Sequence, residues 1–126
     1  MWLVPPAVRI FLARERADMR KSFNGLTALV RRDFPADPLS GHLFVFVGRR
    51  LDRLKILYWD RSGQAIWYRK LERGRFHLPS GAQAVVELDA SGLTMMLEGI
   101  DLARTRRHKR FALPAAAIRE ARRSEF

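Results

Sequence analysis

The stretch "HLFVFVGRRLDRLKILYWDRSGQAIWYRKL", residues 42–71, decides the expected fold. Its first part, "HLFVFVG" (42–48), is apolar at nearly every position, which is typical of a strand buried on both faces. "RRLD" (49–52) is a turn between apolar runs. "RLKILYWD" (53–60) and "QAIWYRKL" (64–71) are rich in aromatic and branched residues and predict two further strands. The stretch therefore predicts a run of three sequential strands.

The segment Asp60-Arg61-Ser62-Gly63 sets the expected register of the last two strands. Asp at the first position and Gly at the last suit a type I turn with a left-handed glycine, which would pair Asp60 with Gln64. In that register one face is mostly apolar and packs on a helix. The other face brings two Trp rings beside three cations: Arg53, Lys55, Trp59, Trp67 and Arg69. A slip of one residue would change this assignment.

Helical periodicity follows a first short strand, "VRIFLA" (8–13). Apolar residues recur at the spacing of one helix face: Met19, Phe23, Leu26 and Val30. With Asp18 as N-cap, the pattern predicts a helix over 19–32. We expect Phe44, Phe46, Ile56 and Tyr58 to be largely buried, with Phe23 and Leu26 against at least some of them.

A second helix is expected near the end of the periodic sequence. "VVEL" (85–88) predicts a short strand, and "DASGLTMMLEG" (89–99) predicts a helix with Asp89 or Ser91 as N-cap and Gly99 as its stop. The expected fold class is α+β, a small and mostly antiparallel sheet in a meander of about four to five strands with two helices packed on it. We expect residues 1–103 to form this single domain and residues 104–126 to form a basic tail, either partly helical or disordered.

The charge of the chain favours a polyanionic partner. The 126 residues include 24 Lys and Arg against 13 Asp and Glu, which gives a net charge of +11. The excess lies in 39–79 and in 104–126, whereas 80–103 is acidic. Such a charge favours nucleic acid or anionic lipid. No apolar run approaches the roughly 20 residues that span a bilayer, so no membrane partner is expected. The absence of cysteine fits a reducing cytoplasm.

No catalytic motif is visible in the sequence. A two-metal transposase core needs several convergent carboxylates, and the carboxylates here show no recognisable metal-ligand spacing. The three histidines, His42, His77 and His108, are far apart in the chain. Neither a Walker loop nor a glycine-rich dinucleotide turn is present. We expect a protein that is not an enzyme, with no catalytic residue, metal site or cofactor.

Three groups of cations are candidates for nucleic-acid binding, and each has a structural alternative. Arg20 and Lys21 lie near a helix start, either on a solvated face or beside a phosphate held by the helix N–H groups. The hairpin rings either pack under Arg and Lys stems or stack with bases. The run 104–110 holds five cations in seven residues, which either contact phosphates or fold against the acidic 87–101 segment. The candidates are Arg20, Lys21, Arg53, Lys55, Trp59, Trp67, Arg69, Arg104, Arg106, Arg107, Lys109 and Arg110.

Five stretches together resemble a known family: "DMRKSFNGL", "SGHLFVF", "DRLKILYWD", "WYRKLERGRF" and "MLEGIDLARTRR". They resemble, over about residues 4–110 and in the same order, the TnpB accessory proteins of IS-sixty-six-type bacterial insertion sequences, the products of the second reading frame. The resemblance implies a role in transposition beside a separate, large transposase. Ser22 and Asn24 stand where this family usually has Gly and Asp, which puts in doubt any role that this segment has in relatives.

Composition and resemblance together give two hypotheses for function. The first is a non-catalytic accessory factor in transposition that binds DNA through the hairpin face and the basic tail. The alternative is a protein-interaction subunit that docks on the transposase or another protein of the insertion sequence and does not contact DNA. A single-strand or RNA binder is a third possibility if stacking on Trp59 or Trp67 dominates. A steep salt dependence of duplex binding would favour the first hypothesis.

Overall fold

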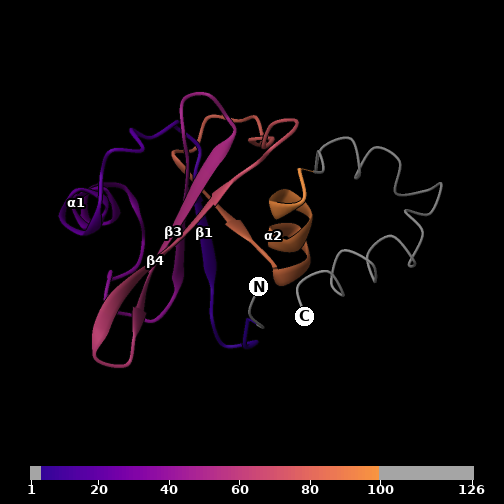
Figure 1. Ribbon diagram of the computed structural model, residues 1–126. Coiled ribbons are helices and arrows are strands. Elements are labelled where there is room, and N and C mark those ends of the chain that lie inside the picture. The colour runs from indigo at the N-terminus through magenta and orange to yellow at the C-terminus, as the bar shows by residue number, and fades with distance from the viewer. Residues whose placement is uncertain (1–3, 100–126) are drawn as a thin grey trace.

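In the computed structural model, which describes residues 4–99, five strands form one sheet in the order β4-β3-β2-β1-β5 (Figure 1). The strands are β1 (Ile10–Ala13), β2 (Leu43–Val47), β3 (Arg53–Asp60), β4 (Gly63–Lys70) and β5 (Val85–Leu88). The helices are α1 (Phe23–Asp33) and α2 (Ala90–Leu97). The expected α+β class and mostly antiparallel sheet are confirmed. Only β2, β3 and β4 form a meander, because β1 pairs in parallel with β2 and antiparallel with β5.

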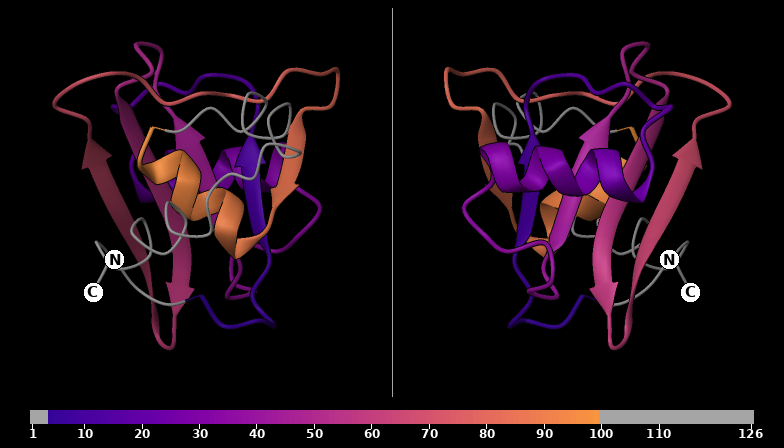
Figure 2. Two further views of the ribbon diagram at one scale, coloured as in Figure 1. Left: turned by 90° about the vertical axis from the view of Figure 1, so that its right-hand side faces the viewer. Right: turned by 90° about the vertical axis from the view of Figure 1, so that its left-hand side faces the viewer.

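The two helices cover opposite faces of the sheet, as the two views of Figure 2 show. Alternate residues of each strand point to opposite faces, so the sheet contributes to two separate apolar clusters. The cluster under α1 includes Phe11, Phe44, Phe46, Leu57, Leu26 and Val30. The cluster under α2 includes Leu12, Val45, Ile56, Leu93, Met96 and Leu97. All five residues of β2 are buried, as expected for the central strand.

The predicted core is mostly confirmed. Phe44, Phe46 and Ile56 are fully buried, and Leu26 packs in the same cluster as the two phenylalanines. Tyr58 is half-buried against the cluster under α2. Phe23 is 42% exposed, so its predicted place in the core is wrong. Phe23 is the first residue of α1, and the end of the helix leaves its ring largely uncovered.

The first helix begins four residues later than predicted, because other contacts hold the segment before it. Asp18 does not cap α1: its Oδ1 accepts the backbone N–H of Arg20 at 2.9 Å. Ser22 occupies the N-cap position without a side-chain hydrogen bond. The side chain of Lys55, only 8% exposed, donates from Nζ to the carbonyl oxygens of Met19 (2.9 Å) and Lys21 (2.7 Å). A lysine on β3 thus fixes the turn that precedes the helix.

The register of the β3–β4 hairpin differs by one residue from the predicted one. Asp60 pairs with Gly63, so that Arg61 and Ser62 alone form the loop. Arg61 takes the left-handed conformation, with a φ of 56°, in place of the predicted glycine. Side chains that were expected together are therefore separated. Trp59 lies on the face covered by α1, whereas Trp67 lies on the opposite face and packs against the cluster under α2.

The second helix is confirmed with its caps. Asp89 precedes α2, and its carboxylate accepts the backbone N–H of Gly92 at 2.6 Å. Gly99 follows with a φ of 77°, the left-handed conformation that ends helices. Within residues 4–99, neither helix is long and apolar enough to cross a membrane. The predicted tail, 104–126, lies outside the described residues.

Candidate nucleic-acid interface

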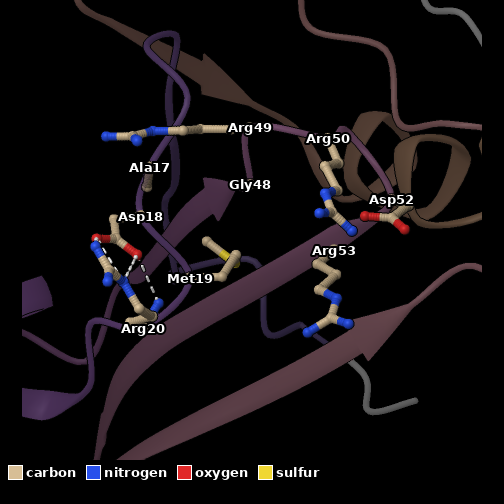
Figure 3. A pocket seen from close by; sticks show the side chains of 9 residues that line it. All are labelled: Ala17, Asp18, Met19, Arg20, Gly48, Arg49, Arg50, Asp52 and Arg53. Atoms are coloured by element: carbon tan, nitrogen blue, oxygen red, sulfur yellow. Dashed lines mark hydrogen bonds and ion pairs between the residues drawn. The ribbon is translucent and has the colours of Figure 1, made fainter.

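Two segments meet beyond the ends of β1 and β2 and form a basic cleft. The N–H of Ala17 donates to the carbonyl of Val47 at 2.8 Å, which extends the parallel pairing to a bridge between Ala17 and Gly48. The Met19 side chain packs directly against Gly48. A Cβ atom at residue 48 would lie only 2.6 Å from the Met19 Cγ. The resulting cavity of about 450 Å³ is called here the arginine cleft (Figure 3). Its lining is Ala17, Asp18, Met19, Arg20, Gly48, Arg49, Arg50, Asp52 and Arg53.

The β2–β3 turn presents two neighbouring arginines to solvent. Leu51 in this turn has a φ of 63°, an uncommon conformation for a bulky residue. Its N–H donates to the carbonyl of Gly48 at 2.9 Å, and its carbonyl accepts the N–H of Phe76 at 2.6 Å. The Leu51 side chain packs against the cluster under α2. Because Leu51 is anchored in this way, Arg49 and Arg50 remain exposed on the outer side of the turn.

An ion pair fixes Arg20 at the other wall of the cleft. Arg20 donates from Nε and Nη2 to the two carboxylate oxygens of Asp18, with an Nη2–Oδ2 distance of 2.8 Å. The Arg20 side chain is 90% exposed. The hydrogen bonds from Arg20 hold the pKa of Asp18 far below its ordinary value, and they raise the pKa of Arg20. The guanidinium is thus oriented by Asp18 while it still faces water.

Arg53 joins the cleft to an exposed aromatic ring. Its Nη1 donates to the hydroxyl oxygen of Tyr68 at 3.1 Å, and this hydrogen bond raises the pKa of Arg53. Tyr68 is 47% exposed, and its ring centroid lies 4.9 Å from the Nζ of Lys55. In the view of Figure 3, Met19 lies between the Asp18–Arg20 pair on one side and Arg50 and Arg53 on the other. The cleft therefore has cations on both walls and a tyrosine beside one of them.

A smaller hollow of about 180 Å³ adjoins the cleft and shares three of its lining residues, Ala17, Asp18 and Arg49. Lys21 lines this hollow, and its stem passes over Gly25, where a Cβ would come within 3.1 Å of the Lys21 Cβ. Arg16 also lines it and donates from Nη1 to the carbonyl of Arg49 at 3.2 Å. The hollow is also lined by Arg32 and by the carboxylates Glu15, Asp18 and Asp33, so its excess of positive charge is small.

The structure brings together only part of the predicted set. Arg20, Lys21 and Arg53 lie in or next to the cleft. Lys55 is buried, and its Nζ donates to the backbone carbonyls of Met19 and Lys21. It therefore has a structural role in place of the predicted contact with a phosphate. Trp59 shares the face of Arg53 but lies at the loop end of the hairpin, away from it.

The other predicted residues lie elsewhere. Trp67 and Arg69 are on the opposite face, where the Arg69 guanidinium lies 5.9 Å from the Trp67 ring centroid and 4.0 Å from an oxygen of Glu98. The prediction of one surface with two Trp rings and three cations is therefore wrong, because of the one-residue shift in register. The predicted tail cations lie outside the described residues: Arg104, Arg106, Arg107, Lys109 and Arg110.

Three cations of this surface were missed: Arg16, Arg49 and Arg50. Arg49 and Arg50 could have been predicted, because they are adjacent in a four-residue turn after a buried strand. Two charged side chains in such a turn must point away from the core. Among the described residues, no three His, Asp or Glu side chains come together so that they could hold a metal ion. The cleft itself carries four arginines against two aspartates, so an anion is the ligand that its charge favours.

The comparisons with known proteins identify one family and two similar proteins. The sequence profile described as "IS66 Orf2 like protein" matches residues 8–107. The chain is 36% identical over 100 residues to "Uncharacterized protein y4jC" of Sinorhizobium fredii (strain NBRC 101917 / NGR234), which covers 79% of this chain and 86% of that protein. It is also 36% identical over 94 residues to "Uncharacterized protein y4hO" of the same strain, covering 75% and 82%. No solved structure matches it significantly.

Proposed function

We propose that this chain, which belongs to the family of IS66 Orf2-like proteins of insertion sequences, is a non-catalytic accessory factor of transposition that binds DNA directly. The proposal assigns the chemistry of strand transfer to a separate transposase and gives this chain the task of holding DNA in the bacterial cytoplasm. It needs no cofactor and no metal.

One observation carries the proposal: the arginine cleft gathers four arginines from two chain segments that are far apart in sequence. Arginine presents five N–H donors in a planar fork that matches the oxygens of a phosphate. Arg20 is oriented by Asp18, and Arg53 by Tyr68, so both guanidinium groups are held before any ligand arrives. Held donors lose less side-chain entropy on binding than free ones. This arrangement suits the phosphates of a DNA backbone.

The charge beyond the cleft supports the same proposal. Arg16 and Lys21 line the adjoining hollow and add two cations near the cleft, although Glu15 and Asp33 also line that hollow. The cations of the tail, 104–110, would add phosphate contacts without sequence preference. Direct contact of DNA with Trp67 and Arg69 is no longer part of the proposal, because they lie on the other face of the sheet.

The salt dependence of duplex binding tests the proposal. Wild type should bind arbitrary duplex DNA with an affinity that falls steeply with salt, since each neutralised phosphate contributes about 0.9 to the logarithmic slope. Replacing both Arg49 and Arg50 by Ala should flatten the slope by up to about 2. A control that removes two charges away from the cleft, Arg31→Ala with Arg61→Asn, should leave the slope nearly unchanged.

The tail is tested by replacing four of its cations by Ala: Arg106, Arg107, Lys109 and Arg110. The slope should flatten by up to about 3 to 4, and all sequences should lose affinity equally. If wild type binds no duplex even at low salt, direct DNA binding is wrong. Co-purification of the chain with the transposase of its insertion sequence would then support the docking alternative, in which the cleft receives an acidic protein surface.

A further inference from the structure

One exposed aromatic ring, Tyr68, lies beside the arginine cleft, and another, Phe23, begins helix α1. Within residues 4–99, large apolar side chains that are well exposed number only three, Phe23, Leu39 and Tyr68. Tyr68 accepts a hydrogen bond from Arg53, which lines the cleft. The Lys55 Nζ lies 4.9 Å from the centroid of the Tyr68 ring and donates to the carbonyl of Lys21. Phe23 is two residues after Lys21 in the chain. Tyr68 therefore lies beside both Lys55 and the cleft, and Phe23 begins the helix that follows the Lys21 contact.

The path of α1 explains why these rings are exposed. The side chain of Gln64 donates to the hydroxyl of Thr27 at 2.8 Å, which fixes the middle of α1 over the loop half of the hairpin. The helix begins only at Phe23, so it does not extend over the other half of β4, where Tyr68 lies. Lys55 fills the space below with a buried ammonium group. The fold thus leaves the Tyr68 ring at the surface beside Lys55, and it leaves the Phe23 ring at the surface where α1 begins.

We infer that the arginine cleft together with Phe23 and Tyr68 forms a platform for unpaired DNA, with phosphates at the arginines and bases stacked on the two rings. The inference rests on the proposed function and names its preferred substrate. Single-stranded DNA offers both a charged backbone and free base faces, whereas the bases of a duplex are already stacked. Surfaces that hold single strands combine a basic groove with exposed rings, and here the exposed ring of Tyr68 is hydrogen-bonded to an arginine of the cleft.

Arg53 couples the two halves of the platform. Its Nη1 is held by the Tyr68 hydroxyl, while the guanidinium lines the cleft. A phosphate bound to Arg53 would therefore lie close to Tyr68. Because every base has a face that can stack, the platform should show little sequence preference.

Matched oligonucleotides and variants test this inference. Affinity is measured for a mixed-sequence single strand, for the same strand as a duplex, and for a strand of equal length with abasic sites. Wild type should bind the single strand more tightly than the duplex at equal salt, and the abasic strand should lose most of the difference. Tyr68→Leu and Phe23→Ala should each weaken single-strand binding by about 5- to 150-fold, the range for loss of one stacking ring. Duplex binding should change less than twofold in Phe23→Ala, and it should differ less than twofold between Tyr68→Leu and Tyr68→Phe, which both lack the hydroxyl that holds Arg53.

Tyr68→Phe is the control that keeps the ring but lacks the hydroxyl that holds Arg53, and it should bind the single strand at least about fivefold more tightly than Tyr68→Leu. The abasic strand tests the inference on folded wild-type protein even if Tyr68→Leu is unstable. Equal binding of the abasic and normal strands, or tighter binding of duplex than of single strand, would overturn the platform while duplex binding by the cleft still stands. Tighter binding of an RNA strand than of the matching DNA would overturn DNA as the ligand. If no oligonucleotide binds, the proposed function fails as well.

Discussion

The Nζ atom of Lys55 lies 2.7 Å from the carbonyl oxygen of Lys21, and it also donates to the carbonyl of Met19. Among the described residues, Lys55 forms no ion pair with a carboxylate within 4 Å. A buried ammonium is costly unless its donors are satisfied, and here backbone carbonyls satisfy it. The contact ties strand β3 to the segment that carries Arg20 and Lys21, so it positions the cleft although it does not line it.

Replacing Lys55 by Met should therefore destabilise the protein. The change leaves two carbonyl groups without their donor, which costs about 1 to 3 kcal/mol in the free energy of unfolding. The control is Lys70→Met on the exposed end of the same hairpin face, which should change stability by no more than about 0.5 kcal/mol. Urea denaturation measures both. Equal midpoints for the two variants would show that the Lys55 contacts contribute nothing to stability.

Because Met19 lies so close to Gly48, the effects of substitutions at the two residues on the free energy of unfolding should not be additive. A Cβ at residue 48 would come within 2.6 Å of the Met19 Cγ, so Gly48→Ala forces the methionine to move. We expect a cost of about 1 to 3 kcal/mol, as for other overpacked sites. In a Met19→Ala background the same change should cost less than half as much. A double-mutant cycle measures the difference, and identical costs in both backgrounds would contradict the steric explanation.

Phe44 and Phe23 should respond very differently to truncation. Phe44 is fully buried in the central strand, so Phe44→Ala should cost about 3 to 5 kcal/mol. That is a large part of the roughly 5 to 15 kcal/mol that stabilises a typical domain. Phe23→Ala should cost less than about 1 kcal/mol because the ring is largely exposed. Thermal or urea unfolding compares the two. A similar loss in both variants would place Phe23 in the core after all.

Acidification should lower stability only well below neutral pH. Hydrogen bonds from Arg20 and Arg9 lower the pKa values of Asp18 and Glu87 in the folded protein. A lowered pKa gives stability that is fully present above the unfolded-state pKa, near 4, and that is lost as the pH falls toward the folded-state value. We expect these two carboxylates to leave the urea midpoint unchanged between pH 7 and pH 5. At pH values below about 4 the midpoint should decrease.

Because both ion pairs are exposed, salt should reduce their contribution. The Asp18→Asn variant should show a smaller decline on acidification than wild type. A midpoint that rises between pH 5 and 3 would contradict the direction of these shifts.

Much of the fold could be predicted from the sequence because the apolar patterns are strong. The continuous apolar run of residues 43–47 identified β2. The helical spacing of apolar residues around Leu26–Val30 and Leu93–Leu97 identified α1 and α2. The capping prediction for α2 held because Asp89 and Gly99 act locally. The start of α1 could not be predicted in this way, since it depends on Lys55, which is more than thirty residues away in the chain.

The site was harder to predict than the fold, and a single loop is the reason. The sequence Asp60–Gly63 suggested a glycine in the left-handed conformation, whereas Arg61 adopts it and the loop is one residue shorter. This difference of one residue in loop length places Trp67 and Arg69 on the face opposite to Arg53, and it places Tyr68 on the same face as Arg53. The local preference of an exposed loop is weak compared with burial, and Trp67 and Ile66 both gain packing partners in the observed register.

The placement of β1 between β2 and β5 has a consequence for the order of folding. Ile10 pairs with Leu43 on one side and with Leu88 on the other. A chain that emerges from the ribosome can form the β2–β3–β4 meander from neighbouring residues, but β1 keeps one edge open until Val85–Leu88 has been synthesised. Pairing over such long separations is slow because the intervening loop must first be closed. A truncated product that ends before β5 would expose an apolar strand edge, and such edges promote self-association.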